Sequence, residues 1–154
     1  MKIAVKWMIP FLILLIVVSC KKGGSTPDPV VPPVIVPDTT KPVISLVDPT
    51  PSKTIVLGTA LHLQMDLSDN VELKSYKVVI SKSLKGVTTS DWAYSNTWTI
   101  AAGKKTFAVN HNEILVPTTY TGNSVTTGNY DMLITCTDLA GNEATTTVIV
   151  ALSK

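Results

Sequence analysis

Residues 59–68 read Thr-Ala-Leu-His-Leu-Gln-Met-Asp-Leu-Ser, with an apolar side chain at every second position from Leu61 to Leu67. Polar side chains, among them His62 and Asp66, occupy the positions between them. Strict alternation of apolar and polar residues is typical of a β-strand with one buried face and one face in solvent. This segment therefore predicts a half-buried strand.

The same two-residue period continues on both sides of this segment. Apolar or aromatic residues occupy every second position in two later segments, at Tyr76, Val78 and Ile80 and again from Tyr130 to Cys136. No convincing stripe with the 3.6-residue period of a helix follows residue 19. The expected strands are 42–47, 54–57, 59–68, 73–81, 106–116, 128–137 and 143–152. Short strands separated by turn residues favour an all-β fold, an antiparallel β-sandwich of about seven strands over residues 42–154.

Two local features refine this prediction. In the expected strand 106–116 the apolar positions change from odd, as at Val109, to even, as at Ile114, which predicts a β-bulge near His111 and Asn112. Between the last two strands, Gly141 is expected to supply the positive φ of a tight turn, in which Asp138 and Asn142 bond to their own backbone. The ring of Tyr130 is expected to be buried, with its hydroxyl bonded to backbone.

Four short segments carry a resemblance to known domains, namely residues 38–44, 68–70, 128–130 and 138–142. They resemble the bacterial Ig-like domains of surface proteins, in which a G-x-Y segment opens the penultimate strand and a D-x-x-G-N turn follows it. More narrowly, residues 61–144 are similar to a family of uncharacterised lipoproteins of Gram-negative bacteria with one Ig-like domain. The resemblance implies an immunoglobulin-like sandwich in the cell envelope and implies no activity. The long insert at residues 82–100 departs from a minimal sandwich.

The first 19 residues have the three parts of an export signal. Lys2 and Lys6 precede an apolar run at residues 8–18, and Ser19 is a small residue at the expected cleavage position. The run of 11 residues is shorter than the ~20 that a membrane-spanning helix needs. We therefore expect a signal peptide over residues 1–19, with an uncleaved anchor as the alternative.

The end of this run, Val17-Val18-Ser19-Cys20, resembles the lipobox of bacterial lipoproteins. The resemblance implies cleavage before Cys20 and attachment of diacylglyceryl to its sulfur, and the family's usual triacyl product supplies the two or more chains that stable anchoring needs. We expect an exported protein that is lipid-anchored in the outer membrane. The choice between the periplasmic and the cell-surface face stays open.

A proline-rich segment follows the expected anchor. Residues 20–41 contain five prolines, which fix φ and remove backbone donors. Such a segment favours an extended linker of about 3.1 Å per residue, although its valines could instead pair as an edge strand.

Composition excludes several classes of function. The chain has no arginine, and its 13 lysines include two in the leader, which leaves 11 against 11 acids. A neutral chain of this kind lacks the basic patch that nucleic acids require. Cys136 is expected to point inward and to behave as a small apolar residue. Because no catalytic motif occurs, we expect no enzyme.

Five polar residues form the first candidate site. Alternate loops of an antiparallel sandwich share one end, so the loop at residues 69–70 and the loop at residues 138–142 are expected to meet beside residue 38. Carboxylate and amide oxygens are the ligands of Ca²⁺. The expected ligands are Asp38, Asp69, Asn70, Asp138 and Asn142. The alternative is that they are ordinary turn residues.

A second candidate is a transition-metal site. His62 and His111 could lie on neighbouring strands and bind the metal, with Glu113 or Asp66 supplying an oxygen ligand; the alternative is that both histidines face solvent.

A third candidate is an aromatic row. If residues 91–100 form a strand, the row is expected to serve as a platform for a ligand or as a second row of core packing. Its members are Trp92, Tyr94 and Trp98.

The leading functional hypothesis is a binding or adhesion module that contacts a glycan or an envelope or host protein. A second is a structural spacer or a subunit of an envelope complex, recognised through its edge strands. A third is a metal-binding domain, and Ca²⁺ is the only cofactor that the sequence suggests. The oligomeric state stays open.

Overall fold

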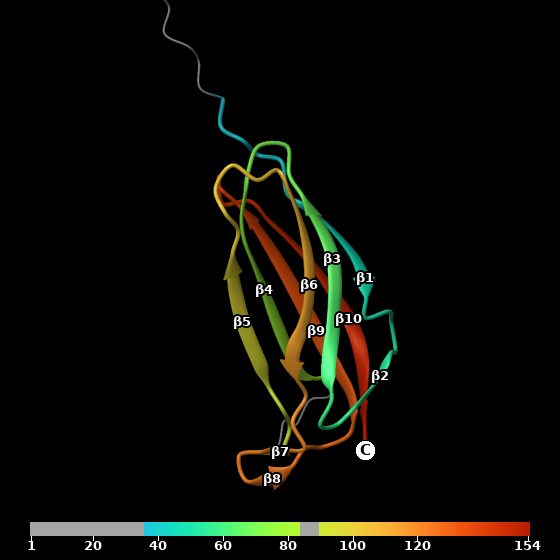
Figure 1. The fold of residues 1–154 in the computed structure, drawn as a ribbon. Coiled ribbons are helices and arrows are strands. Elements are labelled where there is room, and N and C mark those ends of the chain that lie inside the picture. Colours follow the sequence, from blue (N-terminus) through green and yellow to red (C-terminus); the bar gives the residue numbers. More distant parts are fainter. Residues whose placement is uncertain (1–35, 84–89) are drawn as a thin grey trace, which may run out of the picture. The chain divides into compact units, whose positions relative to one another are not determined.

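The computed structural model describes residues 36–83 and 90–154, and every regular element in these ranges is a β-strand. Two sheets pack face to face (Figure 1). The strands are β1 Val43–Asp48, β2 Thr54–Val56, β3 Ala60–Ser68, β4 Leu73–Lys82, β5 Tyr94–Thr99, β6 Thr106–Leu115, β7 Thr119–Tyr120, β8 Asn123–Ser124, β9 Gly128–Asp138 and β10 Glu143–Ser153. The predicted all-β sandwich is confirmed.

The leader, Cys20, linker residues up to 35 and part of the insert (residues 84–89) lie outside the described residues. In the described ranges we find no helix with the length and apolarity needed to cross a membrane. The expectations about export and lipid attachment therefore remain expectations.

One sheet has three strands in the order β1-β3-β6, and the other has five in the order β2-β10-β9-β4-β5. The short strands β7 and β8 form a separate hairpin. All pairings are antiparallel except that of β2 with β10, which is parallel from Thr54 to Val56. The chain reaches β2 by crossing from the first sheet to the edge of the second, which is how a parallel pair arises in an otherwise antiparallel fold.

The core lies between the inner faces of the two sheets. On β3 the four apolar residues from Leu61 to Leu67 are each at most 1% exposed. On β9 the residues Tyr130, Met132, Ile134 and Cys136 are fully buried. Burial of each large apolar side chain contributes about 1.5–3 kcal/mol. The predicted alternation therefore identifies the inner face of both strands correctly.

A bulge interrupts the pairing of β3 with β6. Leu61 pairs with Ile114, but Leu63 pairs with His111, so Asn112 and Glu113 together lie opposite His62. The extra residue allows both ends of β6 to face the core and confirms the predicted bulge. His111 precedes the bulge and pairs with Leu63, so its side chain lies on the inner side of the sheet in phase with Val109.

The loops β3–β4 and β9–β10 meet at the end of the domain where the described chain begins (Figure 1). The amide of Leu139 donates to the carbonyl of Glu72 at 2.9 Å and so joins the two loops. Gly141 has a φ of +94°, as the turn prediction requires. The compact unit spans Val36–Lys154, and residue 38 is hydrogen-bonded to both loops.

Tyr130 lies in the core near the start of β9. Its ring is fully buried, and its hydroxyl donates to the carbonyl of Thr126 at 2.8 Å. The same oxygen accepts a bond from the amide of Trp92 at 3.3 Å. The expected burial of the ring and its bond to backbone are confirmed.

Candidate functional site

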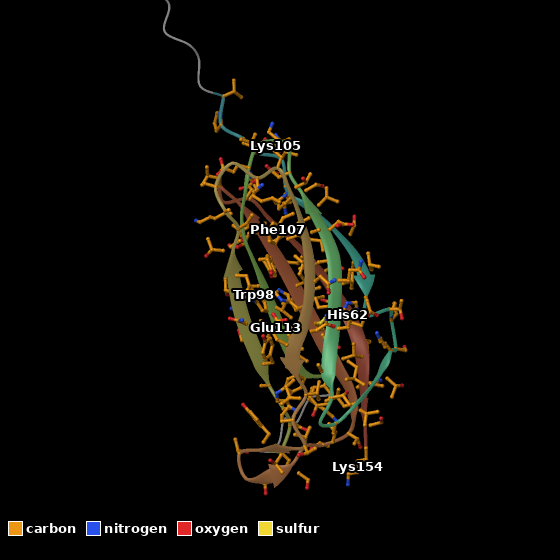
Figure 2. The ribbon with its side chains drawn as sticks, viewed as in Figure 1. His62, Trp98, Lys105, Phe107, Glu113 and Lys154 are labelled. Carbon is orange, nitrogen blue, oxygen red and sulfur yellow. The ribbon has the colours of Figure 1, made fainter. Side chains whose placement is uncertain are left out.

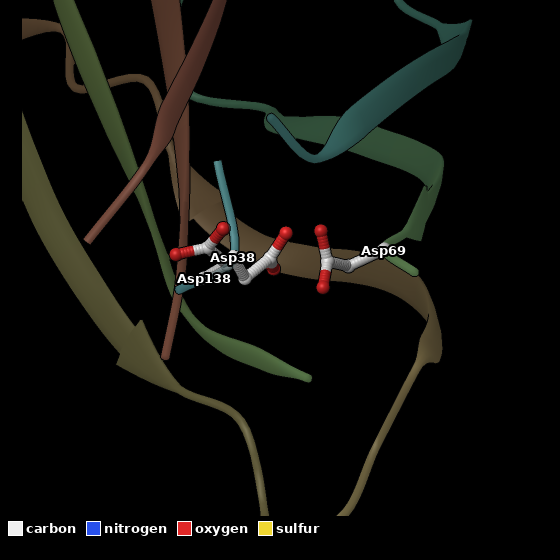
Figure 3. Close-up of side chains that lie close together, drawn as sticks. All are labelled: Asp38, Asp69 and Asp138. Carbon is white, nitrogen blue, oxygen red and sulfur yellow. The ribbon is translucent and has the colours of Figure 1, made fainter. Parts of the chain in front are cut away.

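Three carboxylates converge where the chain enters the sandwich. Asp38 precedes β1, Asp69 follows β3, and Asp138 ends β9. One oxygen from each lies within 4.8 Å of the other two, and Figure 3 shows the three side chains together. Asp138 is fully buried, and the other two are half-buried. The sequence prediction that these three segments meet is borne out by their positions.

Backbone amides hold two of these carboxylates in place. The amides of Val71 and Glu72 both donate to Oδ2 of Asp69 at 2.8 Å. The amide of Thr40 donates to Oδ1 of Asp38 at 3.0 Å. In each case the backbone bonds one oxygen, and the second oxygen has no hydrogen-bond partner.

Two asparagine side chains complete the cluster. Asn70 donates its amide to Oδ1 of Asp38 at 3.1 Å. Asn142 donates to Oδ2 of Asp138 at 2.7 Å and to the carbonyl of Asp38 at 3.2 Å. Hydrogen bonds therefore join four of the five residues expected to bind Ca²⁺, and the carboxylate of Asp69 lies beside them.

The two remaining oxygens have no partner. Oδ2 of Asp38 and Oδ1 of Asp69 are buried atoms without a hydrogen bond. The ion pairs found among the described residues involve Asp48 and Glu113 instead. Buried carboxylate oxygens without a compensating donor or cation are costly.

The charge on Asp38 is favoured locally. The backbone amide of Thr40, followed by the side chain of Asn70, holds the pKa of Asp38 below its usual value. A protein binds Ca²⁺ through six to eight oxygens at about 2.3–2.6 Å, so oxygens on opposite sides of one ion are roughly 5 Å apart. Three oxygens within 4.8 Å of one another fit around one such ion.

The structure does not bring the two histidines together. Nδ1 of His62 is 2.7 Å from Oδ2 of Asp48, and its Nε2 is 3.1 Å from Oδ1 of Asn110, on the outer face of the sheet. Nε2 of His111 shares a 2.6 Å hydrogen bond with the Tyr76 hydroxyl inside the sandwich, and its Nδ1 pairs with Glu113. The interpretation of a shared His62–His111 metal site is wrong because His62 lies on the outer face of β3, whereas His111 faces inward in phase with Val109.

The aromatic row also faces inward. Trp92 is 4% exposed, and its ring centroid lies 6.0 Å from that of Tyr94 and 6.3 Å from that of Tyr130. Trp92 precedes β5, which begins at Tyr94, so the strand is shorter than expected. Trp92 belongs to the core and offers no platform, whereas Tyr94 and Trp98 are half-buried.

Cys136 is fully buried, as expected. Burial, and then the charges of Asp69 and Asp138, raise the pKa of its thiol to about 11. A thiol with this pKa is almost entirely protonated near neutral pH and is therefore a poor nucleophile. In a Cys20→Ser variant we expect Ellman's reagent at pH 8 to leave the native protein unmodified and to label one thiol after denaturation. Rapid labelling of the native protein would contradict this placement.

A recess that the sequence analysis missed lies at the opposite end of the domain. Its volume is ≈ 320 Å³, and more of its wall is apolar than polar. It is lined by Leu57, Thr118, Ser124 and Lys154, the last of which is labelled in Figure 2. These residues are far apart in the sequence and of common types, so no local pattern marks them.

The fold and the acidic cluster define an immunoglobulin-like β-sandwich domain with a carboxylate-lined site where its chain enters. The chain belongs to the family described as Domain of unknown function (DUF4625), whose model matches residues 18–153. A search of curated proteins finds no match.

Solved structures give distant similarities. A β-glucosidase from Listeria innocua in complex with isofagomine is 11% identical with a TM-score of 0.39, and the match covers 73% of this chain and 16% of the enzyme. The soluble domain of PmoD from Methylocystis is 17% identical with a TM-score of 0.31, and the match covers 73% of this chain and 90% of that domain. The chain thus matches about a sixth of the length of the glucosidase.

Proposed function

We propose that this domain binds Ca²⁺ at Asp38, Asp69 and Asp138, and that the ion fixes the start of the domain to two of its loops. One observation carries the proposal. Two buried carboxylate oxygens, on Asp38 and Asp69, have no hydrogen-bond partner, and both carboxylates lie close to that of Asp138. A bound cation would offset the negative charge that these three groups bring together.

The donor set favours Ca²⁺ over transition metals. All the candidate ligand atoms are oxygens, which suit Ca²⁺ and Mg²⁺, whereas imidazole and thiolate ligands are absent from the described cluster. Ca²⁺ accepts an irregular shell and neutral amide ligands, while Mg²⁺ demands a near-octahedral one. Rotation of the Asn70 and Asn142 side-chain amides would present their carbonyl oxygens to the ion in place of their N–H groups.

The sequence supports an exported setting for this site. The lipobox-like end of the leader supports an outer-membrane anchor at Cys20, and the proline-rich segment supports a linker that leads to Asp38. Extracellular modules bind Ca²⁺ with dissociation constants of about 10⁻⁴–10⁻³ M. In this proposal the domain is an envelope module whose junction with its linker is set by Ca²⁺.

Isothermal titration calorimetry of the chelator-treated protein tests this proposal. We expect one Ca²⁺ per wild-type chain and, for Asp69→Asn, a loss of affinity of roughly tenfold or more, since a charged ligand has been removed. Asp66→Asn is the matched control because Asp66 is an exposed carboxylate on the outer face of β3. The absence of any wild-type heat at millimolar Ca²⁺, or equal binding by Asp69→Asn, would rule out the site.

A second candidate function is the binding of an external ligand by the domain surface. Its specific support is a half-buried aromatic side chain, Trp98, on the edge strand β5.

A further inference from the structure

Trp98 lies where the two sheets leave an open side. Strand β5 is the edge of the five-stranded sheet, and β6 is the edge of the three-stranded sheet. The ring of Trp98 on β5 stacks on that of His111 on β6, with centroids 4.4 Å apart. We call this open side between β5 and β6 the seam, and Figure 2 shows Trp98 and Glu113 along it.

The indole of Trp98 covers two rings at once. It stacks on Tyr76 with a centroid distance of 5.1 Å and an interplanar angle of 13°. The interplanar angle between the indole of Trp98 and the ring of His111 is 27°. Tyr76 and His111 are bonded to each other through the tyrosine hydroxyl, so the indole lies over a connected pair.

Both of these rings lie on the same face of the indole. Stacked rings are separated by at least about 3.5 Å, so two rings on opposite faces of a third would be at least roughly 7 Å apart. The centroids of Tyr76 and His111 are 5.9 Å apart. The second face of Trp98 is therefore not covered by this stack, and the side chain is partly exposed.

Polar groups lie close to the stack. Glu113 is 60% exposed, and its carboxylate is held by Nδ1 of His111 and by the amide of Asn112, which donates to Oε2 at 2.9 Å. Burial, followed by the charge of Glu113, raises the pKa of Tyr76 to about 12, which reflects how close the carboxylate lies to the stack. Asn96, on the same strand as Trp98, is exposed.

We propose that the seam binds a neutral saccharide, with a pyranose ring on the free face of Trp98 and its hydroxyls bonded to Glu113 and Asn96. A pyranose presents a face of C–H groups and a rim of hydroxyls, and the seam offers an aromatic face with a fixed carboxylate and an amide at its side. The negative charge of Glu113 disfavours acidic sugars. An organic cation fits less well because cation sites enclose their ligand with several aromatic faces, and here a single free indole face is available.

The test measures binding of neutral polysaccharides to the protein by affinity electrophoresis and by quenching of tryptophan fluorescence. The probes are a β-glucan, a xylan and an α-glucan, with tetramethylammonium and a polyuronate as charged alternatives. We expect at least one neutral glycan to bind, with a loss of roughly tenfold or more for Trp98→Ala. Trp98→Phe, which keeps an aromatic face, should retain part of the binding.

Two further variants keep the test decisive if Trp98→Ala fails to fold. Glu113→Gln and Asn96→Ala alter exposed side chains and should weaken binding without lowering the melting temperature, whereas Leu133→Ala, an exposed residue of β9, should bind as the wild type does. Binding of none of the three glycans, binding of the charged probes alone, or full binding by Glu113→Gln and Asn96→Ala together would overturn the proposal. Repeating the titration in chelator separates it from the Ca²⁺ proposal, since the seam contains no residue of the acidic cluster.

Discussion

Ca²⁺ at about 10 mM is expected to raise the free energy of unfolding of the wild-type protein by about 1.4–2.7 kcal/mol, since this concentration is about 10–100 times the dissociation constants of extracellular modules. A ligand that binds only the folded state stabilises it by about 2.7 kcal/mol at 100 times its dissociation constant and by about 4.1 kcal/mol at 1,000 times. Asp38, Asp69 and Asp138 come from segments far apart in the chain, so unfolding separates them and destroys the site. Urea denaturation followed by circular dichroism, in chelator and in Ca²⁺, measures the difference.

The Asp69→Asn variant distinguishes a cation site from ordinary turn residues. The asparagine keeps an oxygen that can accept from the amides of Val71 and Glu72, so the loop retains its two backbone bonds. Removal of one of three clustered negative charges relieves repulsion in the metal-free protein. In chelator this variant should be as stable as the wild type or more stable, and Ca²⁺ should stabilise it by at least about 1.4 kcal/mol less than it stabilises the wild type.

The opposite pattern would contradict the proposal. If the three carboxylates serve only their turns, Asp69→Asn would lose stability to the same extent with and without Ca²⁺. Asp66→Asn should respond to Ca²⁺ as the wild type does, because its side chain lies outside the cluster.

The acidic cluster could be predicted because it follows from topology and turn chemistry. Loops that alternate along an antiparallel sandwich share one end, and the turn signals at residues 69–70 and 138–142 are local. The same reasoning placed Gly141 at positive φ. What the sequence could not show is that backbone amides occupy one oxygen of Asp38 and one of Asp69 and leave the other unpartnered.

The incorrect predictions share one physical cause. The two-residue period of a strand shows which of its side chains share a face, but it does not show which residues of other strands lie opposite them. The phase change in β6 predicted a bulge, but not that His111 would pair with Leu63 and so face the side opposite to His62. The parallel pairing of β2 with β10 depends on a crossing between sheets that no short pattern records. An aromatic row likewise has the same sequence pattern whether it packs in the core or forms an exposed binding platform. The buried Trp92 and the half-buried Trp98 could therefore be distinguished only from their surroundings in the structure.

The different burial of Trp92 and Trp98 leads to a second prediction, which concerns stability. Trp92→Ala is expected to lower the free energy of unfolding by about 3–5 kcal/mol, the usual cost of truncating a large buried aromatic side chain. The indole is 4% exposed and packs against the rings of Tyr94 and Tyr130. The amide of residue 92 still donates to the Tyr130 hydroxyl in the variant, so the change isolates the loss of side-chain packing.

Trp98→Ala is the matched comparison, because it removes the same side chain from a half-buried position on the neighbouring strand β5. Its cost should be clearly smaller, since part of its surface already contacts water and less apolar area is lost from the core. Equilibrium urea unfolding of both variants, with the slope checked for two-state behaviour, gives the two values. A cost below about 1 kcal/mol for Trp92→Ala would place that indole at the surface, because only surface substitutions are normally so mild. It would also restore Trp92 as a platform residue beside Trp98.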